Sequence, residues 1–291
     1  MIIGSIVALV TPMHADCSVD WKALERLLDL HLESGTAAIG AVGTTGESAT
    51  LDASEHCEVI KHCIDYLAGR LPVVAGTGSN STREAIYFTE AAANAGADAC
   101  LLVTPYYNRP TQRGLFEHYR AVAEAVDIPQ ILYNVPARTA VDLANDTVVR
   151  LAELDNIVGL KDATGEMDRA RELVQRCRED FAIYSGDDPT ARELMLLGGK
   201  GSISVTANVA PLQVAQMCQS ALAGDEEAAA LADEKLIDLN EVLFLEPNPV
   251  PVKWALFERG LIEDGIRLPL TALDDQYHAR VREALKAAEV L

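Results

Sequence analysis

Short apolar segments alternate with amphipathic segments as far as residue 205, and this alternation restricts the fold more than any other feature. Segments such as Asp52–Leu67 and Gln112–Val126 show helical periodicity, and eight apolar runs between such segments are typical of buried strands. The predicted strands are Ser5–Leu9, Ala38–Val42, Pro72–Ala75, Ala99–Thr104, Gln130–Asn134, Ile157–Lys161, Ala182–Ser185 and Gly201–Val205. Because strands in closed parallel sheets are buried on both faces, they are continuously apolar. The sequence therefore predicts an α/β fold, a (β/α)8 TIM barrel.

The remainder of the chain is predicted to be helical. The helices expected after the eighth strand are Pro211–Ala223, Asp225–Leu243, Pro249–Arg259 and Leu273–Ala288. No linker or low-complexity segment divides the chain, so we expect one unit of residues 1–291. Within it, residues 1–210 would form the barrel and residues 211–291 a C-terminal helical extension packed on it. No G-x-G-x-x-G motif follows the first strand, which disfavours a dinucleotide-binding sheet.

Composition excludes several classes of partner. The chain has 24 Lys and Arg residues against 44 Asp and Glu residues, a formal net charge of −20. Such a surface repels nucleic acid and anionic membranes, so we expect neither as a partner. The apolar N-terminus lacks the basic flank of a signal peptide. The cysteines form no C-x-x-C pair and the histidines no metal-binding pattern, so we expect reduced thiols, a cytoplasmic location and no bound metal.

The sixth predicted strand ends in a lysine. Because side chains alternate along a strand, Ile157, Gly159 and Lys161 are expected on one face. Val158 and Leu160 take the other face, which helices would cover. Lys161 then points into the barrel, where a lysine in a dry site tends to lose its proton and becomes a nucleophile for Schiff-base formation. The alternative for a single strand-end lysine is a side chain that reaches solvent.

Other strand ends carry polar residues, and barrel enzymes place their chemistry there. The second strand is followed by Gly43-Thr44-Thr45-Gly46-Glu47-Ser48, in which glycines allow close approach of backbone N–H groups to a carboxylate and threonines supply hydroxyls. A tight turn with a helix cap is the alternative. After the fourth strand, the adjacent residues Tyr106 and Tyr107 point to different sides, so one of them can reach the barrel mouth.

The fifth strand contributes a phenol and a cation. Tyr133 lies two residues after Ile131 and shares its face of the strand, so it faces inward, where a phenol can transfer a proton. Arg138 follows the turn at Pro136, and its guanidinium can bind a carboxylate through two N–H groups. A salt bridge within the loop is the alternative for Arg138. Together with Lys161, these groups suit imine formation with a keto acid.

Several motifs resemble those of class I pyruvate-dependent lyase and synthase barrels, the N-acetylneuraminate lyase and dihydrodipicolinate synthase superfamily. They are, in chain order, Gly43–Glu47, Tyr133–Pro136 and Gly159–Asp162. Three further features resemble the dihydrodipicolinate synthase branch, namely Thr104–Asn108, Arg138 and Asn248–Lys253. The resemblance extends from the first strand to the C-terminal helices. It implies that pyruvate and L-aspartate 4-semialdehyde are condensed, as the first committed step of lysine biosynthesis.

The resemblance also implies the catalytic roles. Lys161 would attack C2 of pyruvate, and the imine would become an enamine that adds to the aldehyde. Tyr133, Thr44 and Tyr107 would form the proton relay, with Tyr107 reaching across from a partner subunit. No metal or organic cofactor is expected, because the lysine imine serves as the electron sink.

Substrate-binding roles follow from the same resemblance. The backbone N–H of Thr45 would hold the pyruvate carboxylate, and Arg138 would bind the carboxylate of L-aspartate 4-semialdehyde. Gly186 and Ile203, at the ends of the seventh and eighth strands, line the site in relatives. Ala137, where relatives often carry Gly or Ser, is expected to be harmless.

The family also carries a feedback site for lysine at a tight-dimer interface. The matching positions here are Ser48, Ala49, His56, Asn80, Glu84 and Tyr106. Glu84 would bind the ammonium group of the ligand. Ala53 stands where some lysine-sensitive relatives have histidine, so we expect inhibition with weaker affinity. We also expect a homo-oligomer built from tight dimers, either alone or paired into a tetramer through contacts such as Leu197.

Three other functions are considered. A sugar keto-acid lyase of the same superfamily is disfavoured by Arg138, since such a site suits neutral hydroxyl partners. A catalytically silent barrel should have lost Lys161 or part of the relay. A phosphate-handling isomerase would bind phosphate after the seventh and eighth strands, where Asp187 and Asp188 would repel it.

Overall fold

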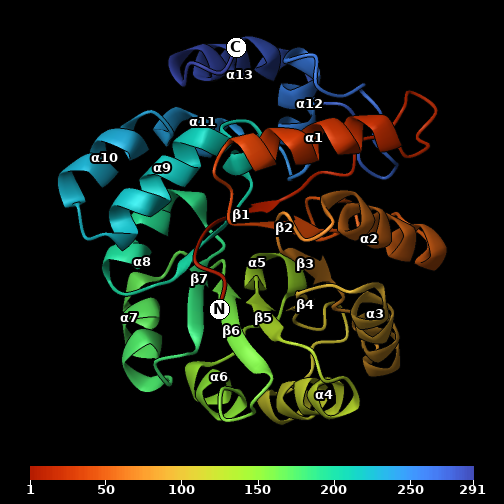
Figure 1. Cartoon of the computed structure of the whole chain (residues 1–291), viewed down its shortest axis with the longest axis vertical. Helices are drawn as coiled ribbons and strands as arrows, with labels where there is room; N and C mark the ends of the chain where they lie inside the picture. The colour runs from red at the N-terminus through yellow and green to blue at the C-terminus, as the bar shows by residue number, and fades with distance from the viewer.

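Eight parallel strands form a closed barrel inside a ring of helices in the computed structural model, which describes all residues from Met1 to Leu291 (Figure 1). The strands are β1 (Gly4–Ala8), β2 (Ala38–Ala41), β3 (Val73–Gly76), β4 (Ala99–Val103), β5 (Gln130–Asn134), β6 (Ile157–Asp162), β7 (Ala182–Ser185) and β8 (Gly201–Ser204). Each strand pairs with the next one in the chain, and β8 pairs with β1. The predicted (β/α)8 barrel is confirmed.

Helices follow the strands in turn. They are α1 (Trp21–Glu33), α2 (Ala53–Leu67), α3 (Thr82–Ala95), α4 (Gln112–Ala125), α5 (Pro136–Thr139), α6 (Asn145–Leu151), α7 (Met167–Arg176), α8 (Ala191–Leu196) and α9 (Pro211–Leu222). The N-terminus of α2 shows why the sequence starts a helix there. The Asp52 side chain accepts from the backbone of Glu55, and the Glu55 side chain accepts from the backbone of Asp52, so two otherwise unpaired N–H groups are satisfied. The short α5 was not expected as a helix; Pro136 occupies its first turn.

The apolar residues form two layers of unequal size. A cluster of 67 buried residues lies between the outward faces of the strands and the helices, whereas 12 buried residues fill the barrel interior. Most of the apolar burial that stabilises the fold therefore lies outside the barrel. The interior includes several alanines, such as Ala8, Ala38 and Ala182. Small residues there leave room for longer side chains nearer the mouth.

A bulge in β6 corrects one prediction. The β5–β6 register shifts after Gln130, so that Ile157 and Gly159 have partners on β5 while Val158 is the extra residue. Ile157 consequently packs in the outer layer, and Val158 contacts the interior cluster. The prediction that Ile157 shares a face with Lys161 is wrong. Beyond the bulge the alternation resumes, with Gly159 and Lys161 directed inward.

The C-terminal helices cover one side of the barrel. After α9 come α10 (Glu226–Glu234), α11 (Ile237–Val242), α12 (Val250–Glu258) and α13 (Asp275–Ala287), and the last two lie at the top of Figure 1. The segment predicted as one helix, Asp225–Leu243, is divided into α10 and α11. Helix α9 packs against β1, so the first helix of the expected extension covers the barrel itself. The division at residue 210 stays a prediction.

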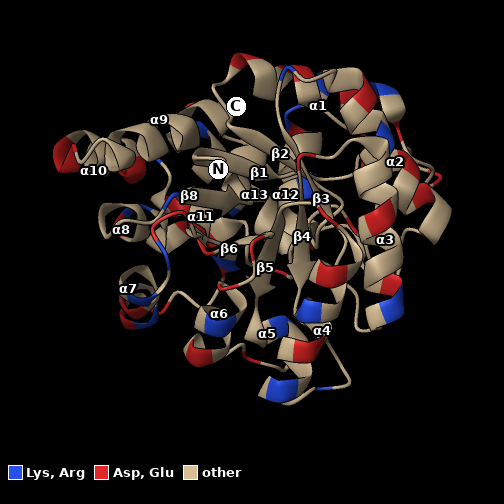
Figure 2. Cartoon of the chain, turned by 60° about the horizontal axis from the view of Figure 1, so that its bottom comes forward, with Lys and Arg blue, Asp and Glu red and all other residues tan.

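Most charged residues lie on the outer helices and connecting loops (Figure 2). Acidic and basic groups are interspersed there in ion pairs such as Lys61–Asp65 and Arg176–Glu172. Exposed pairs of this kind contribute little to stability. None of the helices has the length and apolarity that crossing a membrane requires.

The close approach of β3 to the end of β2 yields a test of the packing. A methyl group at Gly76 would lie 2.2 Å from the Val42 carbonyl oxygen. We expect Gly76→Ala to lower the free energy of unfolding by about 1–3 kcal/mol, because backbone atoms of a packed core cannot move aside freely. Denaturant unfolding followed by circular dichroism measures this. Gly114→Ala on α4, whose new methyl group would meet only side chains at 3.2 Å or more, is the control and should change stability by less than about 1 kcal/mol. Equal stability of the two variants would contradict the structure.

Candidate active site

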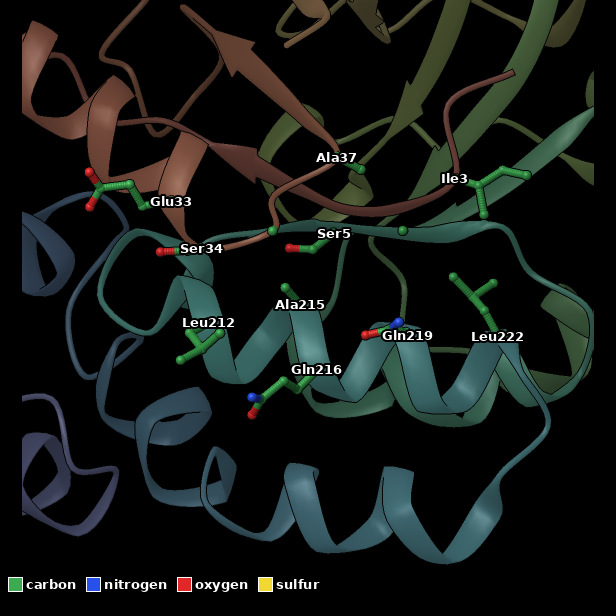
Figure 3. Close-up of a pocket in the computed structure, with 12 residues that line it drawn as sticks. Ile3, Ser5, Glu33, Ser34, Ala37, Leu212, Ala215, Gln216, Gln219 and Leu222 are labelled. Atoms are coloured by element: carbon green, nitrogen blue, oxygen red, sulfur yellow. The ribbon is translucent and has the colours of Figure 1, made fainter. Parts of the chain in front are cut away.

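Two large cavities lie at opposite ends of the barrel. One of about 640 Å³ is at the N-terminal ends of the strands, where Ser5 lies opposite Ala215 of α9 (Figure 3). The other, of about 530 Å³, is lined by residues that follow the C-terminal ends of the strands, including Thr44 and Arg138. Barrel enzymes carry their chemistry at the C-terminal ends. The second cavity is therefore the candidate active site, although it is the smaller.

Lys161 is buried beneath this mouth and does not line the large cavity. It pairs in register with Tyr133, and its Nζ lies 4.3 Å from the centroid of the Tyr133 ring. The missing side chain of Gly186 makes this position possible, since a Cβ there would approach the Lys161 Cε to 2.8 Å. Ile203 is buried in the interior cluster. The structure thus places a buried amine against an aromatic ring.

The predicted relay residues are only partly assembled in one chain. Thr44 and Tyr133 line a narrow pocket of about 40 Å³ that shares Thr44 with the larger cavity. Tyr107 is 90% exposed and lines neither of these pockets. Its backbone has a φ of 72°, in the left-handed region that bulky residues rarely adopt. Its function in a partner subunit stays a prediction.

The loop of residues 43–48 leaves backbone donors free. The backbone N–H groups of Thr44 and Thr45 form no hydrogen bond within the chain. The turn that presents them is strained at both ends, because Val42 and Glu47 each have a φ of 57°. Such conformations cost about 1–3 kcal/mol each and persist only where the surroundings fix them. Unpaired N–H groups in a tight turn form a concavity that suits a carboxylate.

Residues of the C-terminal segment complete the wall of the cavity. The Asn248 side chain donates to the Thr45 hydroxyl at 2.9 Å, and the Asn248 carbonyl accepts from Arg138 at 3.1 Å. Arg138 forms no ion pair with a carboxylate of the chain, so the salt bridge considered as an alternative is absent. Lys253 forms a buried ion pair with Glu47. Sequence reasoning placed Asn248 and Lys253 only within a family motif, and no local pattern links them to a loop some 200 residues earlier.

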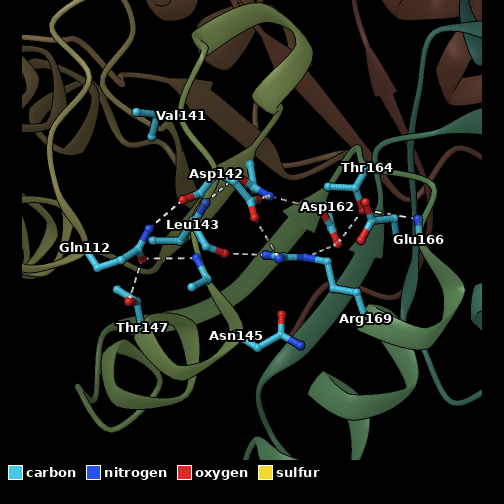
Figure 4. A network of polar contacts seen from close by, with 12 residues as sticks. Gln112, Val141, Asp142, Leu143, Asn145, Thr147, Asp162, Thr164, Glu166 and Arg169 are labelled. Atoms are coloured by element: carbon cyan, nitrogen blue, oxygen red, sulfur yellow. Dashed lines mark hydrogen bonds and ion pairs between the residues drawn. The ribbon is translucent and has the colours of Figure 1, made fainter.

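Support for Lys161 and Tyr133 comes from the residues that follow them. Asp162 lies in a polar network with Asp142 and Arg169 (Figure 4). The Asn134 side chain joins this network by donating to Asp162 at 3.4 Å. The Asn134 side chain donates to Asp142 at 2.8 Å, and the Arg169 Nε donates to Asp162 at 2.9 Å. Burial raises the pKa of Asp162, and Arg169 partly offsets this. The network ties the ends of β5 and β6 to α7 and so fixes the strand ends that carry the amine and the phenol.

Five of the six positions predicted for a lysine site line the same large cavity, namely Ser48, Ala49, His56, Glu84 and Tyr106. The sixth, Asn80, lies beside them and donates to the Tyr106 carbonyl at 3.2 Å. Burial lowers the pKa of His56, which stacks on Phe88. The Glu84 carboxylate accepts from the Ser79 hydroxyl. The cavity therefore joins these positions to Thr44 and Arg138.

One group of possible metal ligands lies outside the cavity. His14, Asp20 and Glu263 place ligand atoms within 4.8 Å of one another, a convergence that the sequence did not predict. Each already has a partner of its own. Asp20 caps α1 by accepting from Ala23, and Glu263 accepts from the backbone of Ala15.

The fold and the cavity define a (β/α)8 barrel with a buried lysine at its mouth, the arrangement expected of a lysine-dependent lyase. Comparison with known proteins agrees. A sequence model described as the dihydrodipicolinate synthetase family matches residues 1–288. The chain is 65% identical over 287 residues to 4-hydroxy-tetrahydrodipicolinate synthase of Thioalkalivibrio sulfidiphilus, which covers 99% of this chain and 98% of that protein. The chain belongs to the dihydrodipicolinate synthetase family.

Solved structures give the same result. Dihydrodipicolinate synthase from Acinetobacter baumannii, chloride-inhibited and complexed with pyruvate, matches with a TM-score of 0.99 and 58% identity over 100% of both chains. Dihydrodipicolinate synthase from Cyanidioschyzon merolae, with lysine bound, matches with a TM-score of 0.96 and 40% identity over 99% of both chains.

The Asp162–Arg169 pair yields a test of the network. We expect Arg169→Met to lower the free energy of unfolding by about 3–5 kcal/mol at neutral pH, because it leaves a buried carboxylate without its partner. The pKa of Asp162 would then rise further, so the difference from the wild type should shrink as the pH falls and this carboxyl takes up a proton. Urea unfolding at several pH values measures the difference.

Arg171→Met, which breaks an exposed pair with Asp168 on the same helix, is the control. Its effect should stay within about 0.5 kcal/mol at every pH. A pH-independent deficit in Arg169→Met would show that the buried charge of Asp162 is not the cause.

Proposed function

We propose that this chain condenses pyruvate with L-aspartate 4-semialdehyde, the reaction of 4-hydroxy-tetrahydrodipicolinate synthases. This is the first committed step toward diaminopimelate and lysine. The observation that carries the proposal is the buried Lys161, packed over Tyr133 at the mouth of a barrel of this family. Lys161 forms no direct ion pair, and its nearest described partner is the face of the Tyr133 ring.

The first half of the reaction takes place on pyruvate. The Lys161 amine attacks C2, water leaves, and an imine forms. Removal of a proton from C3 gives the enamine, since the imine accepts the electron pair. Tyr133 and Thr44, with Tyr107 of a second chain, transfer these protons. The free N–H groups of Thr44 and Thr45 support the proposed binding of the pyruvate carboxylate.

In the second half, the enamine carbon adds to the aldehyde of L-aspartate 4-semialdehyde and forms the new C–C bond. Arg138 binds the carboxylate of this substrate, a role supported by its position at the cavity wall and by a guanidinium that forms no ion pair within the chain. The substrate amine then attacks the imine carbon, the ring closes, and Lys161 is released. The lysine is the electron sink, so this chemistry requires neither a metal nor an organic cofactor.

Regulation and assembly belong to the same proposal. Lysine inhibits by binding beside the mouth, where the cavity joins the positions around Glu84 to Thr44. The active form is a homo-oligomer built on a tight dimer, a proposal that the exposed and strained Tyr107 supports. Six free cysteines support a cytoplasmic location.

Borohydride trapping tests the reaction. Incubation with pyruvate and borohydride should add the mass of reduced pyruvate to the protein, and peptide mapping should place it on Lys161. Lys161→Ala should show no adduct and lose at least about four orders of magnitude in turnover with L-aspartate 4-semialdehyde, because the covalent route is closed. A folded wild-type protein without an adduct would reject the proposal. Adduct formation without turnover of the semialdehyde would instead favour a sugar keto-acid lyase.

Inhibition by lysine is tested through Glu84. Glu84→Gln should raise the lysine concentration for half-inhibition by about tenfold or more, because the ammonium loses its charged partner. Ala53→His, which adds a polar ring to the cavity wall, should lower it. Glu90→Gln, at an exposed position of the same helix, is the control and should leave inhibition unchanged. Turnover that saturating lysine does not affect in the wild type would reject the regulatory site.

A further inference from the structure

We propose that the C-terminal segment Asn248–Lys253 positions the carboxylate-binding loop of residues 43–48, chiefly through the ion pair between Lys253 and Glu47. The inference rests on the proposed function of this loop and deepens it. It makes Lys253 and Glu47 positioning residues: they act on pyruvate through the backbone N–H groups of Thr44 and Thr45.

The pair is buried on both sides. The Glu47 side chain is 0% exposed and that of Lys253 is 5% exposed. The second carboxylate oxygen of Glu47 accepts from the backbone N–H of Arg267 at 3.2 Å, so both oxygens have donors. Because a buried charge without a partner is strongly unfavourable, each member of the pair constrains where the other can lie. Lys253 lies on α12, so the helix fixes Glu47 from outside the barrel.

The loop needs such a constraint. Glu47 itself has a left-handed backbone, and so does Val42 at the other end of the loop. A second tie comes from the same C-terminal segment, where the Asn248 side chain donates to the Thr45 hydroxyl. A third comes from the barrel, where the Thr11 hydroxyl donates to the Gly46 carbonyl at 2.7 Å. Strained backbone persists where several contacts over-determine it, and here two of these three contacts come from residues 248–253.

The arrangement also connects the two proposed carboxylate sites. Asn248 contacts Thr45 through its side chain and Arg138 through its carbonyl oxygen. The same short segment therefore borders the group that binds pyruvate and the group that binds the second substrate. A displacement of this segment should affect binding of pyruvate more than the chemical step. Of the proposed reacting groups only Thr44 lies on the loop, whereas Lys161 and Tyr133 are held by the separate network on β5 and β6.

Three variants distinguish the effect of the Glu47–Lys253 pair on the position of the loop from its effect on the stability of the protein. Glu47→Gln and Lys253→Met each break the ion pair and should lower the unfolding midpoint. The double variant Glu47→Met/Lys253→Met removes both charges of this pair and should recover most of the lost stability. We expect the pyruvate concentration for half-maximal borohydride trapping, and KM for pyruvate, to rise roughly tenfold or more in all three, since misplaced binding groups weaken the productive complex. The turnover number at saturating pyruvate should fall much less.

Glu258→Gln is the matched control. Glu258 lies on α12, as Lys253 does, but its ion pair is with Arg282 of α13, away from the loop. It should leave half-maximal trapping unchanged. If the double variant does not fold, Asn248→Ala tests the second tie without altering charge and should raise the same concentration severalfold.

The inference is overturned if the double variant recovers stability together with wild-type trapping, or if Asn248→Ala and the single variants trap pyruvate as the wild type does. These outcomes leave the proposed reaction standing, because the wild type still forms its adduct. A wild type that forms no adduct rejects the proposed function and this inference with it.

Discussion

The closed ladder of parallel strands is the constraint on which the site depends. Since β8 pairs with β1, every strand has two partners and all C-terminal ends reach one face. The register of β5 with β6 places Tyr133 opposite Lys161 and Asn134 opposite Asp162. Alternation then directs the first pair into the barrel and the second pair outward into the polar network. One step along each strand separates the reacting groups from the groups that hold them.

Buried ionisable side chains near the mouth differ in whether a group of opposite charge lies beside them. Asp162 is paired with Arg169, and Glu47 is paired with Lys253, so these charges act as fixed links between elements. Burial lowers the pKa of Lys253, while Glu47 opposes this change. Lys161 is equally buried but has an aromatic ring as its neighbour and no ion pair. A lysine that serves structure and a lysine suited to nucleophilic attack thus differ in their partners and not in their burial.

Local sequence patterns were sufficient for the strands and for the inward direction of Lys161 and Tyr133, because apolar runs and alternation are properties of neighbouring residues. They failed at Val158, since a bulge depends on how β5 and β6 register and leaves no signal in one strand. They also could not pair Glu47 with Lys253, because 206 positions separate them and only the folded chain brings them together. The free N–H groups of Thr44 and Thr45 were anticipated from glycine spacing, whereas the contacts that fix them were not.

The position of Tyr107 has a consequence for the proposed relay. Proton transfer requires hydrogen-bond reach between the groups involved, and a tyrosine that is 90% exposed on the loop after β4 does not meet this condition within its own chain. The left-handed backbone at this residue aims an aromatic side chain away from its own barrel at an energetic cost, which is reasonable if a second chain receives it. In that case three parts of the assembly form the mouth. They are the strand ends of the barrel, the C-terminal segment Asn248–Lys253 that positions the loop, and the Tyr107 phenol of another subunit. An isolated chain would then still form the imine through Lys161 but would transfer protons slowly. Assembly would therefore change the turnover rate more than it changes adduct formation.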